Sequence, residues 1–173
     1  YVGINSDNSI AEMTISSSYT ESTIYGNTAT GNGGAIGLNR GTVTVKSGNF
    51  SNNTAGNGGA IYLGNGDMKM NNIFIDGNTA TKSGGGVYLA NGTLTVKDAD
   101  NNKIINNTAE STGGGIQVQD GKLEMEKCLV QENKANYGGG VCVNNSKPIT
   151  INLLNSAINF ERNTATTAGG GMA

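Results

Sequence analysis

Several residue types that catalytic and metal sites commonly use are scarce or missing in this sequence. Its 173 residues include no histidine, no tryptophan, one proline and two cysteines, and only 14% of them are charged. The missing histidine removes a frequent general base and metal ligand. Cys128 and Cys142 are too few for a disulfide framework and lack CxxC spacing, so we expect one buried and one exposed thiol. The composition therefore predicts no metal site and no cofactor.

Hydrophobic runs and strong charge are missing too. The formal net charge is −2 and the basic residues are scattered, which argues against nucleic acid as a partner. No stretch approaches the ~18 consecutive apolar residues of a membrane span, and residues 1–20 do not resemble a signal peptide. We expect no membrane insertion by this segment, with any export signal outside it. A 35% apolar share suits a narrow core built coil by coil.

What the sequence has in abundance is glycine, asparagine and threonine, arranged in a repeat. An asparagine followed by Thr-Ala in five of six copies recurs at spacings of 26, 25, 29, 26 and 30 residues. These anchors are Asn27, Asn53, Asn78, Asn107, Asn133 and Asn163. A glycine cluster follows each anchor, as in GGAI at 33–36 and GGGV at 84–87. Repeats of this period indicate a solenoid.

Three alternating apolar runs lie in each repeat, and a period of two predicts strands. The first run follows the glycines, as with Ile36 and Leu38, and the second follows a turn, as with Ile149 and Ile151. The third run ends three residues before each anchor, with Ile24, Phe50, Ile75, Ile104, Val130 and Phe160. Three short strands and three bends per coil predict an all-β fold, a parallel β-helix of about six to seven coils.

The anchors and glycines are expected to form corners. Coils stacked at ~4.8 Å align the anchor side chains, whose amides then bond to one another as in other asparagine ladders. Glycine permits a tight bend or a positive φ. The expected corner glycines are Gly33, Gly34, Gly58, Gly59, Gly85, Gly86, Gly114, Gly115, Gly139 and Gly140. Insertions in the longer repeats, near residues 97–102 and 144–158, are expected to bulge outward as loops.

The combination of GGAI with F-x-x-N at Phe50–Asn53 and Phe160–Asn163 resembles the repeat of the chlamydial polymorphic outer-membrane proteins, which are autotransporter adhesins. Related coils occur in other adhesin-like surface proteins. The resemblance covers about residues 20–173 and implies a secreted, right-handed parallel β-helix that contacts host or neighbouring cells. The sequence departs from that pattern by relaxing GGA to GGG in four copies and replacing Phe with Ile or Val in four.

Two other functions are compatible with a β-helix. Polysaccharide-degrading lyases and glycosidases need paired carboxylates, for which Asp98 with Asp100, Glu124 with Glu126, and Asp76 are the candidates. Glu124 and Glu126 share a strand beside a lysine, which is more typical of a solvated face. Ice binding needs a flat hydroxyl array. The Thr-x-Thr pairs suggest one, but Lys134 and other residues interrupt it, so a purely structural repeat is the simpler explanation of the threonines.

We therefore expect residues 1–173 to be a single β-helix segment, cut from a longer solenoid, that serves as an extracellular adhesin stalk or passenger without an active site. It would be attached to the cell surface through regions outside this segment. Its partner would be a protein or glycan on another cell. Tyr62 and Tyr88 follow equivalent inward residues and should be exposed side by side on one face. Rigid aromatic surface is common at such contacts, so this pair is the candidate contact patch.

Overall fold

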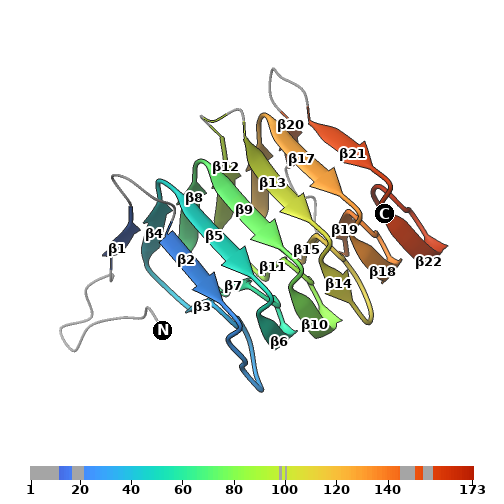
Figure 1. Cartoon of the computed structure of the whole chain (residues 1–173), viewed down its shortest axis with the longest axis horizontal. Helices are drawn as coiled ribbons and strands as arrows, with labels where there is room; N and C mark the ends of the chain where they lie inside the picture. Colours follow the sequence, from blue (N-terminus) through green and yellow to red (C-terminus); the bar gives the residue numbers. More distant parts are fainter. Residues whose placement is uncertain (1–11, 17–21, 98, 100, 145–150, 154–157) are drawn as a thin grey trace.

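The computed structural model describes residues 12–16, 22–97, 99, 101–144, 151–153 and 158–173. These residues form 22 strands, β1 to β22, and no helix. The strands wind into coils stacked side by side along one axis, and the colours in Figure 1 progress along that axis from blue to red. No helix in the described part of the chain could therefore cross a membrane.

Four parallel sheets run along the stack, because strands of successive coils pair with one another. Sheet 1 contains β3 (Ile36–Leu38), β7 (Ile61–Leu63), β11 (Val87–Leu89), β15 (Ile116–Val118) and β19 (Val141–Val143). Sheet 2 contains β1 (Glu12–Ile15), β4 (Thr42–Val45), β8 (Asp67–Met70), β12 (Thr93–Val96), β16 (Lys122–Met125) and β20 (Ile151–Leu153). Sheet 3 contains β2 (Ser22–Tyr25), β5 (Gly48–Ser51), β9 (Ile73–Asp76), β13 (Asn102–Ile105), β17 (Cys128–Gln131) and β21 (Asn159–Glu161). Sheet 4 contains β6 (Thr54–Asn57), β10 (Thr79–Ser83), β14 (Thr108–Ala109), β18 (Lys134–Tyr137) and β22 (Thr164–Ala168).

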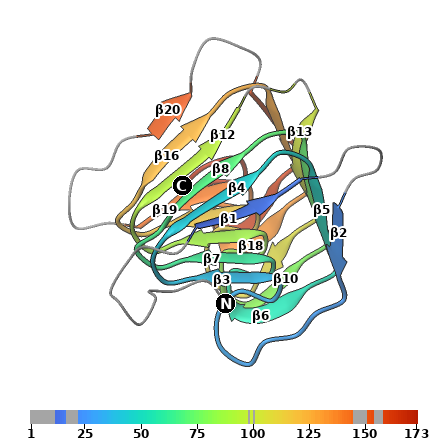
Figure 2. The same cartoon turned by 90° about the vertical axis from the view of Figure 1, so that its left-hand side faces the viewer.

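The parallel β-helix expected from the repeat is confirmed, with two corrections. A full coil has four strands instead of three, because the segment after every anchor except Asn27 is itself a strand of sheet 4 (Figure 2). Its inward side chain is only an alanine, so it shows no alternation of large apolar residues. Ala80, Ala109 and Ala135 are buried there as a separate small cluster. The sheets hold five or six strands each, which gives about five full turns instead of six to seven.

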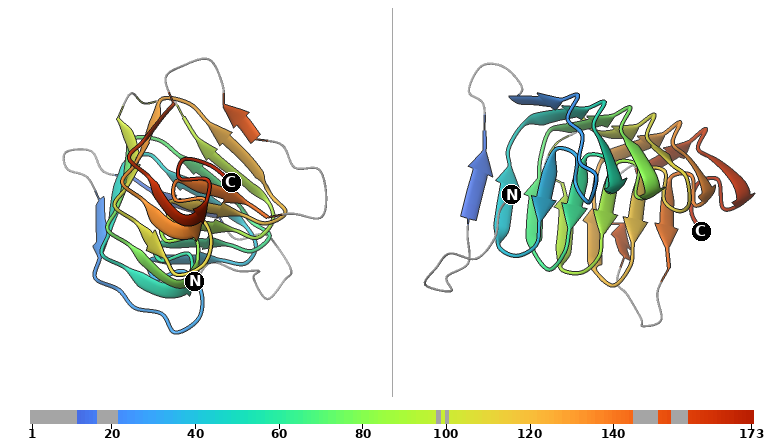
Figure 3. Two further views of the ribbon diagram at one scale, coloured as in Figure 1. Left: turned by 90° about the vertical axis from the view of Figure 1, so that its right-hand side faces the viewer. Right: turned by 90° about the horizontal axis from the view of Figure 1, so that it is seen from below.

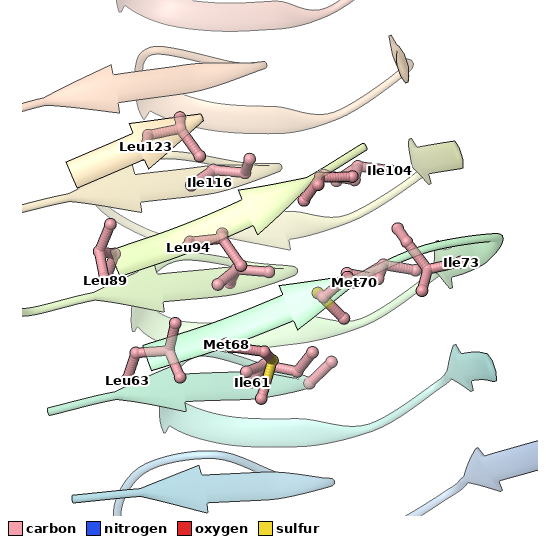
Figure 4. Packing of buried hydrophobic residues seen from close by; sticks show 14 of the residues in the cluster. Ile61, Leu63, Met68, Met70, Ile73, Leu89, Leu94, Ile104, Ile116 and Leu123 are labelled. Atoms are coloured by element: carbon pink, nitrogen blue, oxygen red, sulfur yellow. The ribbon is translucent and has the colours of Figure 1, made fainter. Parts of the chain in front are cut away.

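The interior is a stack of apolar rows, one per inward position. Ile36, Ile61, Val87, Ile116 and Val141 pair in register along sheet 1. Figure 4 shows side chains from neighbouring coils, among them Leu63, Leu89 and Leu94, packed in this core. Burying a side chain of this size contributes roughly 1.5–3 kcal/mol. The narrow core thus compensates for the low apolar content of the chain.

One register expectation is wrong. Leu123 and Met125 of β16 pair with Ile151 and Leu153 of β20, two residues later than the expected Ile149 and Ile151. The alternating apolar run around these positions is long enough to fit both registers, and pairing with the preceding coil selects one. Of the two insertions, residues 98, 100, 145–150 and 154–157 lie outside the described residues. Of the first, Asn102 is buried, where its Oδ1 accepts a hydrogen bond from the Ile73 amide at 3.2 Å.

Candidate functional site

The six anchor asparagines lie in one file at the corner between sheets 3 and 4. The Nδ2 of Asn53 donates to the Oδ1 of Asn78 at 3.0 Å, and the backbone N–H of Asn53 donates to the same oxygen at 2.9 Å. The Asn53 Nδ2 also donates to the Ile24 carbonyl of the preceding coil at 3.0 Å. The same pattern repeats through Asn107 and Asn133 to the end of the file. The links between asparagine side chains all run in one direction, from each coil to the next.

This geometry satisfies the inner side chains completely. Each inner Oδ1 accepts two hydrogen bonds and each Nδ2 donates two, which is the full capacity that a buried amide commonly uses. Asn53, Asn78, Asn107 and Asn133 are 0% exposed. Asn27 is exposed and Asn163 half-buried at the two ends of the file. The ladder therefore provides a buried polar seam in which no amide group lacks a partner.

A second regularity of this corner was missed by sequence reasoning. The residue just before each anchor has positive φ, between 50° and 67°, at Gly26, Asn52, Gly77, Asn106, Glu132 and Arg162. Glu132 and Arg162 adopt this left-handed conformation despite its cost of roughly 1–2 kcal/mol for an ordinary residue. The position turns the chain so that the next side chain points inward. Only the glycines and asparagines among the six signal such a turn, so the sequence pattern was incomplete.

The glycine corner depends on the first glycine of each cluster. Gly33, Gly58, Gly84, Gly113, Gly138 and Gly169 have φ between 60° and 70°. A Cβ at Gly113 would lie 2.5 Å from the Ile116 carbonyl oxygen. The second glycine fits for another reason, since a Cβ at Gly114 would lie 2.5 Å from the Lys134 carbonyl oxygen of the next coil. The expected set therefore omitted four positive-φ positions, Gly84, Gly113, Gly138 and Gly169.

Tyr62 and Tyr88 lie side by side on the outer face of sheet 1. Their rings are stacked, with centroids 5.5 Å apart and an interplanar angle of 18°. Both side chains are half-buried, where exposed ones were expected. Burial, then the nearby Tyr62 and Asp120, raise the pKa of the Tyr88 hydroxyl. The pair therefore presents ring faces and edges without being fully open to solvent.

The same outer file becomes buried farther along the stack. Gln117 and Cys142 continue the register of Tyr88 but are only 1% and 4% exposed. The expectation of one exposed thiol is therefore wrong, because both cysteines are free and buried. Burial raises the pKa of the Cys128 thiol to about 12, and burial also raises the pKa of Cys142. Neither thiol has the environment of a reactive nucleophile.

The candidate carboxylates do not form a cluster where they are described. Glu124 is paired with Lys122 at 2.5 Å on the outer face of sheet 2. Asp76 accepts a hydrogen bond from the Asn106 Nδ2 at 2.9 Å. Asp98 and Asp100 lie outside the described residues. Within the described ranges there is no group of three or more acidic or cysteine side chains that could hold a metal ion.

The threonine files are interrupted in space as well as in sequence. Along sheet 4, Thr54, Thr79 and Thr108 pair in register, and Lys134 follows them. Along the first outward file of sheet 2, threonines alternate with charged residues, in the order Thr42, Asp67, Thr93 and Lys122. Neither file therefore presents a continuous flat array of hydroxyl groups.

Sequence reasoning also missed a cluster of basic residues where sheet 2 passes into sheet 3. Lys46, Lys69 and Lys97 line one hollow there. Lys46 and Lys97 occupy equivalent positions two repeats apart, and Lys69 lies two residues before the equivalent position of the coil between them. The sequence contains this basic cluster, but it can be recognised only when the repeats are aligned on their outward residues as well as on their apolar ones.

The comparison with protein families gives one match, to a model described as the right-handed β-helix region, over residues 3–172. The comparisons with curated proteins and with solved structures found no match. The family match is general, and gives no evidence for the narrower chlamydial repeat. It agrees with the four parallel sheets and the stacked coils of the structure. The chain therefore belongs to the right-handed β-helix family.

Proposed function

We propose that this chain is the extracellular stalk or passenger segment of a surface adhesin. The observation that carries the proposal is the unbroken stacking of coils around a narrow, fully packed core, which makes a rod whose outer faces repeat (Figure 3). Such rods offer extended surfaces for binding. The resemblance of the GGAI and F-x-x-N segments to the chlamydial adhesins supports the same function. The rod would hold its outward side chains away from the cell that carries it.

Within this proposal, Tyr62 and Tyr88 form the contact patch. Their stacked, half-buried rings are held rigidly by two neighbouring strands, so little side-chain entropy is lost when a partner covers them. Tyrosine is enriched at the energetically important positions of protein interfaces. The patch accordingly suits a protein or glycan on a facing cell.

The test is attachment of protein-coated beads to candidate cells. The Tyr62→Ser/Tyr88→Ser variant should attach less than the unchanged protein. A Tyr25→Ser/Tyr137→Ser variant, which removes the two exposed tyrosines of sheets 3 and 4, should attach equally well. If the first variant keeps its circular dichroism spectrum and attaches as before, the contact patch is refuted. If no bead coated with the unchanged protein attaches to any cell, the adhesin proposal itself fails.

Polysaccharide degradation is the alternative function. The ion pair between Lys122 and Glu124 and the hydrogen bond from Asn106 to Asp76 engage two of the candidate carboxylates on the outside of the rod. These contacts favour a scaffold over a catalytic site. Incubation with polygalacturonate and other polysaccharides, followed by measurement of new reducing ends, tests the point. Released product that disappears in an Asp98→Asn/Asp100→Asn variant would replace the proposal with an enzyme.

A further inference from the structure

Two hollows lie on either side of the corner where sheet 2 passes into sheet 3, and both span the same three coils. The first has a volume of about 190 Å³ and lies at the end of sheet 2. The second has a volume of about 490 Å³ and lies on the outer face of sheet 3. Asn71 lines the first hollow and Asn72 the second, so the two adjoin in the chain.

The first hollow is basic. Lys69 projects from the middle of it, in register with Thr44 and Thr95 of the flanking strands. Lys46 and Lys97 directly follow the ends of β4 and β12. Their backbone amides continue the hydrogen bonds of sheet 2, from Lys46 to the Ile15 carbonyl and from Lys97 to the Met70 carbonyl. Lys46 and Lys97 are equivalent to Asn71 of the coil between them, and Lys69 lies two residues before Asn71, so the three side chains come from neighbouring strands that are ~4.8 Å apart.

No carboxylate in the described part of the chain forms an ion pair with any of these three lysines. The chain as a whole carries a net negative charge, so this gathering of ammonium groups departs from the average surface. Like charges brought together on a rigid sheet repel one another, and a bound anion relieves that repulsion. The hollow is therefore suited to a carboxylate or sulfate group.

The second hollow combines an aromatic ring with amide groups. Asn49, Phe74 and Lys103 pair in register on the outer face of sheet 3. The Lys103 Nζ lies 5.5 Å from the centre of the Phe74 ring. The Asn49 Oδ1 is buried and accepts no hydrogen bond within the described chain, whereas Asn101, which lines the same hollow, is exposed and presents its amide to solvent. An apolar ring edged by polar donors and acceptors matches the two sides of a sugar.

We propose that this corner binds an acidic polysaccharide. Lys46, Lys69 and Lys97 hold a carboxylate or sulfate group of the chain, and a neighbouring sugar ring packs against Phe74 with its hydroxyl groups bonded to the Asn101 amide. An acidic sugar chain is the ligand that offers a charge and an apolar ring face in alternation, as the two hollows require. This site lies on sheets 2 and 3, away from the tyrosine patch of sheet 1, and adds a ligand class to the proposed function.

The test is equilibrium binding of the whole purified chain to four probes: oligogalacturonate, dextran sulfate, unmodified dextran and single-stranded DNA. The Lys69→Gln/Lys97→Gln variant should bind the acidic sugars roughly tenfold more weakly, as expected for losing charge-assisted contacts. The matched control is Lys82→Gln/Lys134→Gln, which removes two exposed lysines of sheet 4 and should leave the affinity unchanged. Added salt should weaken binding by the unchanged protein, because the site is open to solvent.

Phe74→Leu should weaken binding of both acidic sugars without changing its salt dependence, which separates the ring contact from the charges. Oligogalacturonate and dextran sulfate distinguish carboxylate from sulfate as the preferred group.

Equal affinity of the lysine variant and its control would overturn the proposal, as would equal binding of unmodified dextran or tighter binding of DNA. If the double variant does not fold, Lys46→Gln replaces it with the same expected direction. Since binding is measured without cells, failure here leaves the adhesin proposal standing.

Discussion

Replacing Asn78 by alanine removes the centre of the asparagine ladder. The Asn78 Nδ2 donates to the Phe50 carbonyl at 2.9 Å and to the Asn107 Oδ1 at 2.9 Å. Its Oδ1 accepts from the backbone N–H of Asn53 at 2.9 Å and from the Asn53 Nδ2 at 3.0 Å. The substitution therefore breaks four buried hydrogen bonds at once.

The cost follows from what these groups can do afterwards. The Asn53 backbone N–H loses its only acceptor in a region that is 0% exposed, while the Asn53 Nδ2 keeps the Ile24 carbonyl alone, and leaving a buried donor unpaired costs about 1–3 kcal/mol. The Asn107 Oδ1 keeps its hydrogen bond from the Asn78 backbone N–H, at 3.0 Å, so this oxygen still has one of its two donors. We expect a loss of roughly 3 kcal/mol in the free energy of unfolding. For a chain of this size that corresponds to a melting temperature lower by about 10 °C.

Asn65→Ala is the matched control. Asn65 is also an asparagine that bonds to the next coil, but it is exposed and its Oδ1 accepts a single bond from the Asn91 Nδ2, at 2.9 Å. Water can replace that bond, so the change should cost less than about 0.5 kcal/mol. Thermal unfolding followed by circular dichroism measures both variants. Equal melting temperatures for Asn78→Ala and Asn65→Ala would refute the reasoning, since the ladder would then contribute no more than a surface contact.

Two further predictions concern the glycine corner and the buried thiol. Gly113→Ala should lower the melting temperature markedly, because the φ of Gly113 is +65° and the new Cβ would meet the Ile116 carbonyl. Gly31→Ala should leave the melting temperature nearly unchanged, because a Cβ there would have nothing within 4 Å. Similar losses for both variants would contradict the steric explanation. Burial raises the Cys128 pKa to about 12, so the folded chain keeps a proton that the unfolded chain releases near pH 9, and stability should fall as pH rises from about 9 to 12. Cys128→Val should fall less steeply over that window in urea titrations, and an unchanged slope would exclude the thiol as the cause.

The sequence contains most of the information for the inner rows of the fold. Ile24, Phe50 and Ile75 were placed in one file from spacing alone, and they pair in register in sheet 3. This worked because large apolar side chains that alternate with polar ones can face the core in only one way. Sheet 4 was not foreseen, since its inward residue is an alanine and hydrophobic periodicity cannot detect so small a side chain.

The outer surface was harder to predict because it depends on contacts between segments that are distant in the chain. Tyr88 and Gln117 occupy equivalent outward positions of neighbouring repeats, and the residues around them in the sequence do not indicate different burial. Only Gln117 is nevertheless fully buried. The positive φ of Glu132 and Arg162 likewise has no local signal. It is imposed by the neighbouring coils, whose equivalent residues already turn in the same way.

The one-way ladder and the four sheets have a mechanical consequence for a rod attached at one end. The backbone hydrogen bonds of all four sheets join each coil to the next, so a pull that separates two coils is resisted by all the bonds of that interface together. When the end coil does detach, its 26 or so residues extend to about 90 Å, in place of the ~4.8 Å that the coil occupied in the stack. The rod would therefore lengthen in large steps, one coil at a time, while the remaining coils keep their shape.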